Sequence, residues 1–174
     1  MSKRWLLCAL FSAQIWLMPI GEAGPQEDYQ RGYDAYRADD VVTAMQYLEK
    51  AADQGHGDAR VLLAYILDKA EENARAIELY RQAAEQGNPA GQLGLGQMYA
   101  SGEGVQRSHE TALEWIQRAV DKGYVPAIVH LAEIYEKGAL GLPVDEQKSL
   151  MLWKKAATLG NEQAIKKVES MTKQ

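Results

Sequence analysis

The stretch AMQYLEKAADQG, at residues 44–55, decides the fold because close relatives of it return three times along the chain. These relatives are AIELYRQAAEQG at 76–87, ALEWIQRAVDKG at 112–123 and SLMLWKKAATLG at 149–160. The four copies begin at residues 44, 76, 112 and 149, so the period is 32 to 37 residues. A repeat of this length predicts an array of stacked helix pairs.

Each copy has the pattern of a helix that packs through one apolar side. Apolar residues three, four, seven and eight positions apart share one face of a helix, and in the first copy they are Ala44, Tyr47, Leu48, Ala51 and Ala52. The residues expected to end the four helices are glycines, which reach the left-handed conformation at little cost: Gly55, Gly87, Gly123 and Gly160. The residues expected to begin them are Asp40, Glu72, Ser108 and Asp145, of which Glu72 is the weakest cap.

A second apolar pattern precedes each copy and predicts a first helix in every unit. It aligns Leu63, Ala64 and Leu67 with the sets Leu95, Gly96, Tyr99 and Leu131, Ala132, Tyr135. Asn88 followed by Pro89 is a typical helix start. The sequence therefore predicts an all-α, superhelical solenoid of about four helix-turn-helix units, at about 26–55, 56–87, 88–123 and 124–160, closed by a capping helix within 161–174.

The N-terminal stretch has the pattern of a secretory signal peptide. Lys3 and Arg4 precede an apolar run from Trp5 to Ile20, and small residues follow. We expect cleavage near Ala23, which places the protein in the periplasm or outside the cell. The alternative is that residues 1–23 stay as a membrane anchor, and only then would the protein contact a membrane.

Composition restricts the classes of partner and chemistry. Cleavage would remove Cys8, the single cysteine, and leave no disulfide, thiolate metal site or cysteine nucleophile. The net charge is −5, which argues against nucleic acid as a partner. Four units with capped ends predict a stable monomer, although a homodimer through an exposed end remains open.

Catalytic motifs are missing from the sequence. It contains no phosphate-binding P-loop and no Gly-x-Ser-x-Gly, and Gly94 and Gly96 fall in a helical pattern without a preceding strand. His56 and His109 are expected in solvated positions near helix starts. His130 and Glu133 lie one helical turn apart, which fits either a polar helix face or, less readily, a metal or acid–base site. The sequence therefore predicts no enzyme, no catalytic residue, no metal and no cofactor.

The third and fourth units carry a resemblance to a known family. They read AGQLGLGQMYASGEGVQRSHETALEWIQRAVDKG and AIVHLAEIYEKGALGLPVDEQKSLMLWKKAATLG. Leu-Gly-x-x-Tyr, Gly-x-Gly-Val, Ala-x-x-Trp and a closing glycine resemble the Sel-one-like repeat, a relative of the tetratricopeptide repeat. The first two units lack the glycine-rich loop and look closer to a plain tetratricopeptide hairpin.

This resemblance implies an adaptor or scaffold, and in bacteria often one that is periplasmic or secreted. We therefore expect a protein-interaction module of the bacterial cell envelope, with no small-molecule cofactor. One alternative is a secreted factor that acts on a host or neighbouring cell. A less favoured one is an enzyme acting on cell-wall material or β-lactams; family members suggested to act so are rich in disulfides, whereas this chain has one cysteine.

A groove along the first helices is the expected binding site for a protein or peptide. The residues after the small positions of the four first helices should point into it, namely Tyr33, Tyr65, Gln97 and Glu133. Flanking positions add Tyr29, Tyr36, Asp68, His130 and Glu136. Tyrosine suits a binding surface, but Tyr29 and Tyr36 would equally serve to cover the N-terminal end of the core. Basic groups of the ligand are expected toward Glu133 and Glu136.

Overall fold

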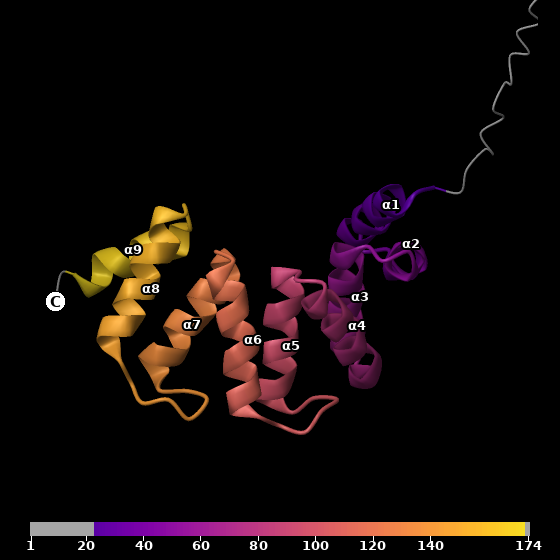
Figure 1. Cartoon of the computed structure of the whole chain (residues 1–174). Helices are drawn as coiled ribbons and strands as arrows, with labels where there is room; N and C mark the ends of the chain where they lie inside the picture. Colours follow the sequence, from indigo (N-terminus) through magenta and orange to yellow (C-terminus); the bar gives the residue numbers. More distant parts are fainter. Residues whose placement is uncertain (1–22, 173–174) are drawn as a thin grey trace, which may run out of the picture.

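The protein is a curved stack of helix pairs, as Figure 1 shows for the computed structural model, which describes residues 23–172. The predicted signal peptide and its alternative, a membrane anchor, fall almost wholly outside the described residues. The helices in the described part are α1 (Pro25–Arg37), α2 (Val41–Asp53), α3 (Gly57–Lys69), α4 (Asn73–Glu85), α5 (Pro89–Ser101), α6 (His109–Asp121), α7 (Val125–Lys137), α8 (Glu146–Thr158) and α9 (Glu162–Met171). The predicted all-α solenoid, with four helix pairs and a closing helix, is confirmed.

Helix ends follow from the local sequence. The side chains of Asp40, Ser108 and Asp145 each accept a hydrogen bond from a backbone N–H in the first turn of α2, α6 and α8. Glu72, the weak candidate, makes no such bond at the start of α4. The glycines that close the four second helices all have φ between 73° and 90°, and these are Gly55, Gly87, Gly123 and Gly160.

The core is built by small residues that let helices approach. Gly96 of α5 shows this directly, because a Cβ added there would lie 2.8 Å from Cγ1 of Ile116 on α6. The buried apolar residues form two clusters, one spread over α2 to α5 and the other over α5 to α9. Helix α5 contributes to both clusters and therefore joins the two halves of the molecule.

The connections inside the helix pairs differ between the two halves of the chain. In the first two pairs a short turn joins the helices, with Asp39 and Glu71 each at φ 62°. In the last two pairs the connections are longer, at residues 102–108 and 138–145, and both loops lie along the lower edge in Figure 1. Gly102, Gly104, Gly138 and Gly141 adopt positive φ in these loops, a conformation that glycine tolerates without a steric penalty.

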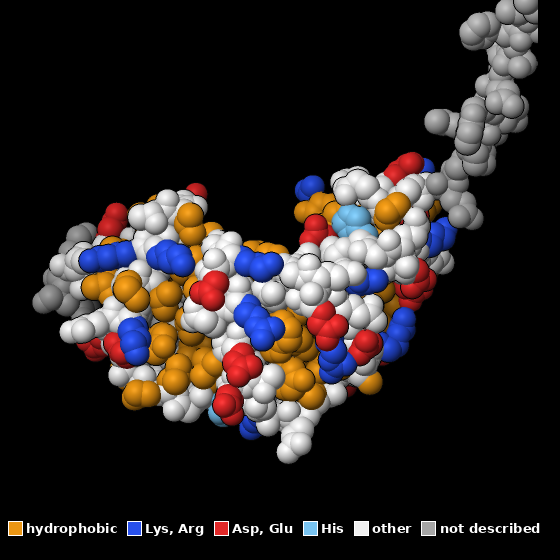
Figure 2. Space-filling model, in the orientation of Figure 1, with side chains coloured by type: hydrophobic (Ala, Val, Ile, Leu, Met, Phe, Trp, Pro, Cys, Tyr) orange, Lys and Arg blue, Asp and Glu red, His pale blue; other side chains and the backbone are white. Residues whose placement is uncertain are grey.

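The stack bends toward its first helices. Helix α3 packs against both α1 and α5 as well as against its own partner α4. Within residues 23–172, α2 makes no contact of similar extent with α4, and neither does α4 with α6. First helices thus lie closer together than second helices in the N-terminal part of the stack, and we call the face that they form its inner side. Figure 2 shows the outline of the molecule hollowed between its two ends. None of the described helices is long and apolar enough to span a membrane.

Candidate partner-binding groove

A cavity lined by tyrosines lies on the inner side of the arc, near the N-terminal end. Its volume is about 330 Å³, and we call it the tyrosine cavity. Tyr29 and Tyr33 of α1, Tyr65 of α3 and Gln97 of α5 line it, together with apolar residues such as Leu93. Tyr33 and Tyr65 are 38% and 42% exposed, so their rings are open to a partner.

The tyrosines at this end are held in place by aromatic contacts. The Tyr29 ring stacks on His56 with ring centroids 4.6 Å apart, and Tyr36 meets Tyr65 edge-on at 6.5 Å. His56 is not simply solvated as expected, because its Nδ1 accepts from the Ala59 N–H and its ring therefore caps α3. The imidazole has a fixed orientation and supports the Tyr29 ring.

Tyr29 and Tyr36 also pack against the first apolar cluster. This contact is expected if the two tyrosines cover the N-terminal end of the core. Tyr29 serves both purposes because it lines the cavity as well, whereas Tyr36 does not. Burial raises the pKa of Tyr29, helped by the negative charge of Asp58, and burial also raises the pKa of Tyr36. Both hydroxyls are therefore neutral hydrogen-bond donors at physiological pH.

A second cavity continues the groove toward the C-terminal half. It has a volume of about 420 Å³ and is lined by Asp68 of α3, Gln97 of α5, Glu103 of the 102–108 loop and His130 of α7. We call it the acidic cavity. Tyr80, Gly94 and Gln97 line both cavities, so the two cavities adjoin, and we call them together the inner groove.

His130 lies in the acidic cavity as an uncharged side chain. Burial lowers the pKa of this imidazole, Glu133 acts in the opposite direction and Lys137 lowers it further. At neutral pH the ring therefore offers one N–H donor and one nitrogen acceptor. Within residues 23–172, no three His, Cys, Asp or Glu side chains converge as a metal site would require.

Tyr80 is a groove residue that sequence reasoning missed, as is Glu103 of the 102–108 loop. Tyr80 belongs to α4, a second helix, at the position that matches Leu48 on the apolar packing side of the first copy. The structure passes its ring beside Gly94 of α5, where an added Cβ would collide with the ring. The only signal in the sequence is a tyrosine where the other copies have Leu48, Ile116 and Trp153, combined with a glycine on the following helix.

The remaining predicted residues lie outside the lining of the inner groove. Glu133 is half-buried, and its carboxylate lies 3.7 Å from Nζ of Lys137 on the same helix. Glu136 accepts hydrogen bonds from Nζ of Lys167 at 2.6 Å and from Nε1 of Trp153 at 3.3 Å. Each of these carboxylates already has a cationic neighbour, which offsets part of its charge toward a basic ligand. The structure thus gathers Tyr29, Tyr33, Tyr65, Asp68, Gln97 and His130 along the groove, and leaves Tyr36, Glu133 and Glu136 outside it.

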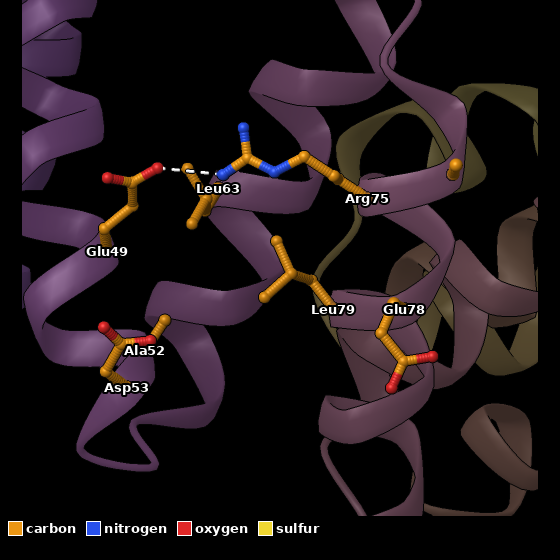
Figure 3. A pocket seen from close by; sticks show the side chains of 8 residues that line it. Glu49, Ala52, Asp53, Leu63, Arg75, Glu78 and Leu79 are labelled. Atoms are coloured by element: carbon orange, nitrogen blue, oxygen red, sulfur yellow. Dashed lines mark hydrogen bonds and ion pairs between the residues drawn. The ribbon is translucent and has the colours of Figure 1, made fainter.

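A larger depression of about 470 Å³ lies between α2 and α4 (Figure 3). Arg75 extends across it to Glu49, with 2.9 Å between Nη2 and Oε1, and also pairs with Glu72. Leu63 and Leu79 supply a small apolar floor. The Arg75 guanidinium is already paired with two carboxylates. This depression on the side of the second helices therefore offers a partner fewer free polar groups than the inner groove does.

Comparisons with known proteins show which family model and which relatives this chain is similar to. The model of the Sel1 repeat matches residues 24–56, 59–88, 89–124 and 125–161. An uncharacterized protein of Neisseria meningitidis serogroup B is 30% identical over 132 residues, covering 75% of this chain and 28% of that protein. The ERAD-associated E3 ubiquitin-protein ligase component HRD3A of Arabidopsis thaliana is 30% identical over 141 residues, covering 71% of this chain and 21% of that protein. The chain thus spans between a fifth and a third of these relatives.

Among solved structures, the crystal structure of a Sel1 repeat protein from Oxalobacter formigenes superposes with a TM-score of 0.70 at 25% sequence identity. The match covers 76% of this chain and 56% of that one. The repeat pattern and the helix arrangement therefore agree with those of a protein whose structure was determined independently.

Proposed function

Because this chain belongs to the Sel1 repeat family, we propose that it is a non-enzymatic interaction module that holds a peptide or protein segment in its inner groove. One relative is named as a component of a ubiquitin ligase, which supports a role in assembling proteins. We further propose that the module works in the bacterial cell envelope, on the basis of the signal-peptide pattern in residues 1–23.

The observation that carries this proposal is that two cavities adjoin along the first helices. The two cavities run across α1, α3, α5 and α7 and share three lining residues. The exposed rings of Tyr33 and Tyr65 offer large contact area, a hydrogen-bonding hydroxyl and little side-chain entropy to lose. A surface of this kind binds an extended chain better than it binds a small molecule, because it is long and open.

Affinity capture from a detergent-solubilised bacterial envelope tests the proposal. The full-length protein should recover a reproducible partner, and Tyr33→Ala combined with Tyr65→Ala should weaken recovery at least about tenfold, since aromatic anchors dominate interface energies. The matched control is Met151→Ala with Leu159→Ala, which truncates two exposed side chains of the C-terminal half that line neither cavity.

Equal recovery by the tyrosine variant and the control variant would remove the groove from the proposal, provided that both unfold at the wild-type temperature. The cellular location has its own test. Fractionation of intact cells should place the protein with the periplasm, whereas accumulation in the culture supernatant would favour the secreted alternative.

A further inference from the structure

We propose that the acidic cavity receives a basic side chain, arginine by preference, from the peptide held in the inner groove. This inference rests on the proposed function and names one feature of its ligand. It moves the expected basic contact from Glu133 and Glu136, which have cationic neighbours, to Asp68 and Glu103.

The first observation is an unpartnered hydroxyl at the base of the groove. Tyr80 is only 7% exposed, and it lines both cavities at the point where they join. Its hydroxyl makes no hydrogen bond to any other residue in the described range 23–172. This hydroxyl is not fully enclosed, since the one enclosed side-chain polar atom without a partner in that range is Oε1 of Gln92, so it opens onto the groove and can hydrogen-bond a ligand.

The second observation is the charge of the cavity wall. The carboxylates of Asp68 and Glu103 form no ion pair with a basic side chain of the described residues, and Glu103 accepts a hydrogen bond only from the neighbouring Ser101 Oγ, at 2.9 Å. The cations nearby are committed elsewhere: Lys69 lies over the Tyr65 ring, and Arg107 donates to the Ser101 carbonyl. The cavity therefore presents negative charge toward its opening.

These groups together match a guanidinium. The cavity offers two carboxylates, the amide oxygen of Gln97, the hydroxyl of Tyr80 and a neutral imidazole at His130. Arginine has five N–H donors in one plane, so it can reach several separated acceptors at once, whereas lysine offers a single point charge. The adjoining tyrosine cavity would hold an apolar or aromatic residue of the same peptide.

A displayed library of random dodecapeptides, selected on the purified full-length protein, tests this assignment. Selected peptides should be lost on Tyr33→Ala with Tyr65→Ala, which shows that they occupy the groove. Among them, one register should be enriched in arginine by at least about tenfold, equivalent to about 1.4 kcal/mol of preference. Binding should weaken as salt is raised, as expected for a charged contact.

The key variant is Asp68→Asn with Glu103→Gln, and its matched control is Glu85→Gln with Glu114→Gln, which removes the same charge from exposed positions on α4 and α6. Selection on the key variant should lose the arginine register and keep the apolar one, while the control should keep both. Groove-dependent peptides without a basic register would overturn this inference alone. Absence of any groove-dependent peptide would overturn the proposed function itself.

Discussion

At the scale of single residues, the groove depends on a glycine. Gly94 of α5 leaves room for the Tyr80 ring to pass from α4 to the inner side, and a side chain there would meet the ring. The residues at the matching position of α3 and α7 are Leu62 and His130, which leave no such opening. The tyrosine and the glycine therefore act as a pair that brings the Tyr80 hydroxyl to the groove.

This pair yields a stability prediction. Gly94→Ala should lower the free energy of unfolding by about 1–2 kcal/mol, because overpacking against Tyr80 outweighs the better helix propensity of alanine. Urea unfolding measures the change. In a Tyr80→Leu background, which copies Leu48 of the first unit, the same substitution should become neutral or stabilising. A destabilisation of equal size in both backgrounds would contradict the contact.

Residues that act on their own helix could be predicted from the sequence around them. Asp40, Ser108 and Asp145 cap their helices as expected, because a cap requires only a side chain three residues from its N–H partner. Tyr80 and His56 could not be placed, because their roles depend on residues of neighbouring helices. No spacing rule along one helix reports that Tyr80 meets Gly94 or that His56 meets Tyr29.

At the scale of the helix, Glu136 joins three elements. It belongs to α7, and it accepts from Trp153 of α8 and from Lys167 of the closing helix α9. The Lys167 ammonium and its hydrogen bond lower the pKa of Glu136, and burial opposes this effect. This contact could not be predicted, because a pattern within the closing helix does not show which residue of α7 lies opposite Lys167.

The contact predicts a dependence of stability on pH. The folded state holds the Glu136 pKa below the unfolded value, about 4.3, so the stabilisation is present above that value and is lost as pH falls through the lowered folded pKa. Glu136→Gln should therefore reduce the urea midpoint at pH 7, and the difference from wild type should shrink below pH ~4. Urea titrations across this range measure it.

Glu133→Gln on the same helix is the control, because its partner Lys137 lies within α7 and is largely exposed. It should change the midpoint little at any pH. If the urea midpoint of Glu136→Gln stays below that of wild type by the same amount down to pH ~3, the Glu136 carboxylate does not carry the effect.

At the scale of the whole molecule, the chain is two apolar clusters joined through α5. The array itself could be predicted from the sequence because the period, the small residues and the closing glycines all recur. A superhelical stack with a groove along the first helices was expected too, but the extent of contact between successive first helices, such as α1 with α3, could not be predicted from patterns within single helices. The short turns at Asp39 and Glu71 and the longer loops of the last two pairs agree with the difference expected between the halves.

The two clusters predict that unfolding spreads from neighbour to neighbour. Leu48→Ala, in the first cluster, should cost about 2–5 kcal/mol and raise amide hydrogen exchange mainly in α1 to α4. Ile128→Ala, in the second, should act mainly on α6 to α9. Hydrogen exchange followed by mass spectrometry resolves the two patterns, and equal acceleration of all helices by both variants would show a single cooperative unit.

The central claim is that a partner occupies the inner groove, and site-specific photocrosslinking tests it most directly. A benzophenone amino acid would replace Gln97, which lines both cavities, and in a second variant Met151, an exposed residue of α8 that lines neither. In intact bacterial cells, we predict a discrete crosslinked protein from position 97 and none from position 151. A partner crosslinked from position 151 but not from position 97 would contradict the account.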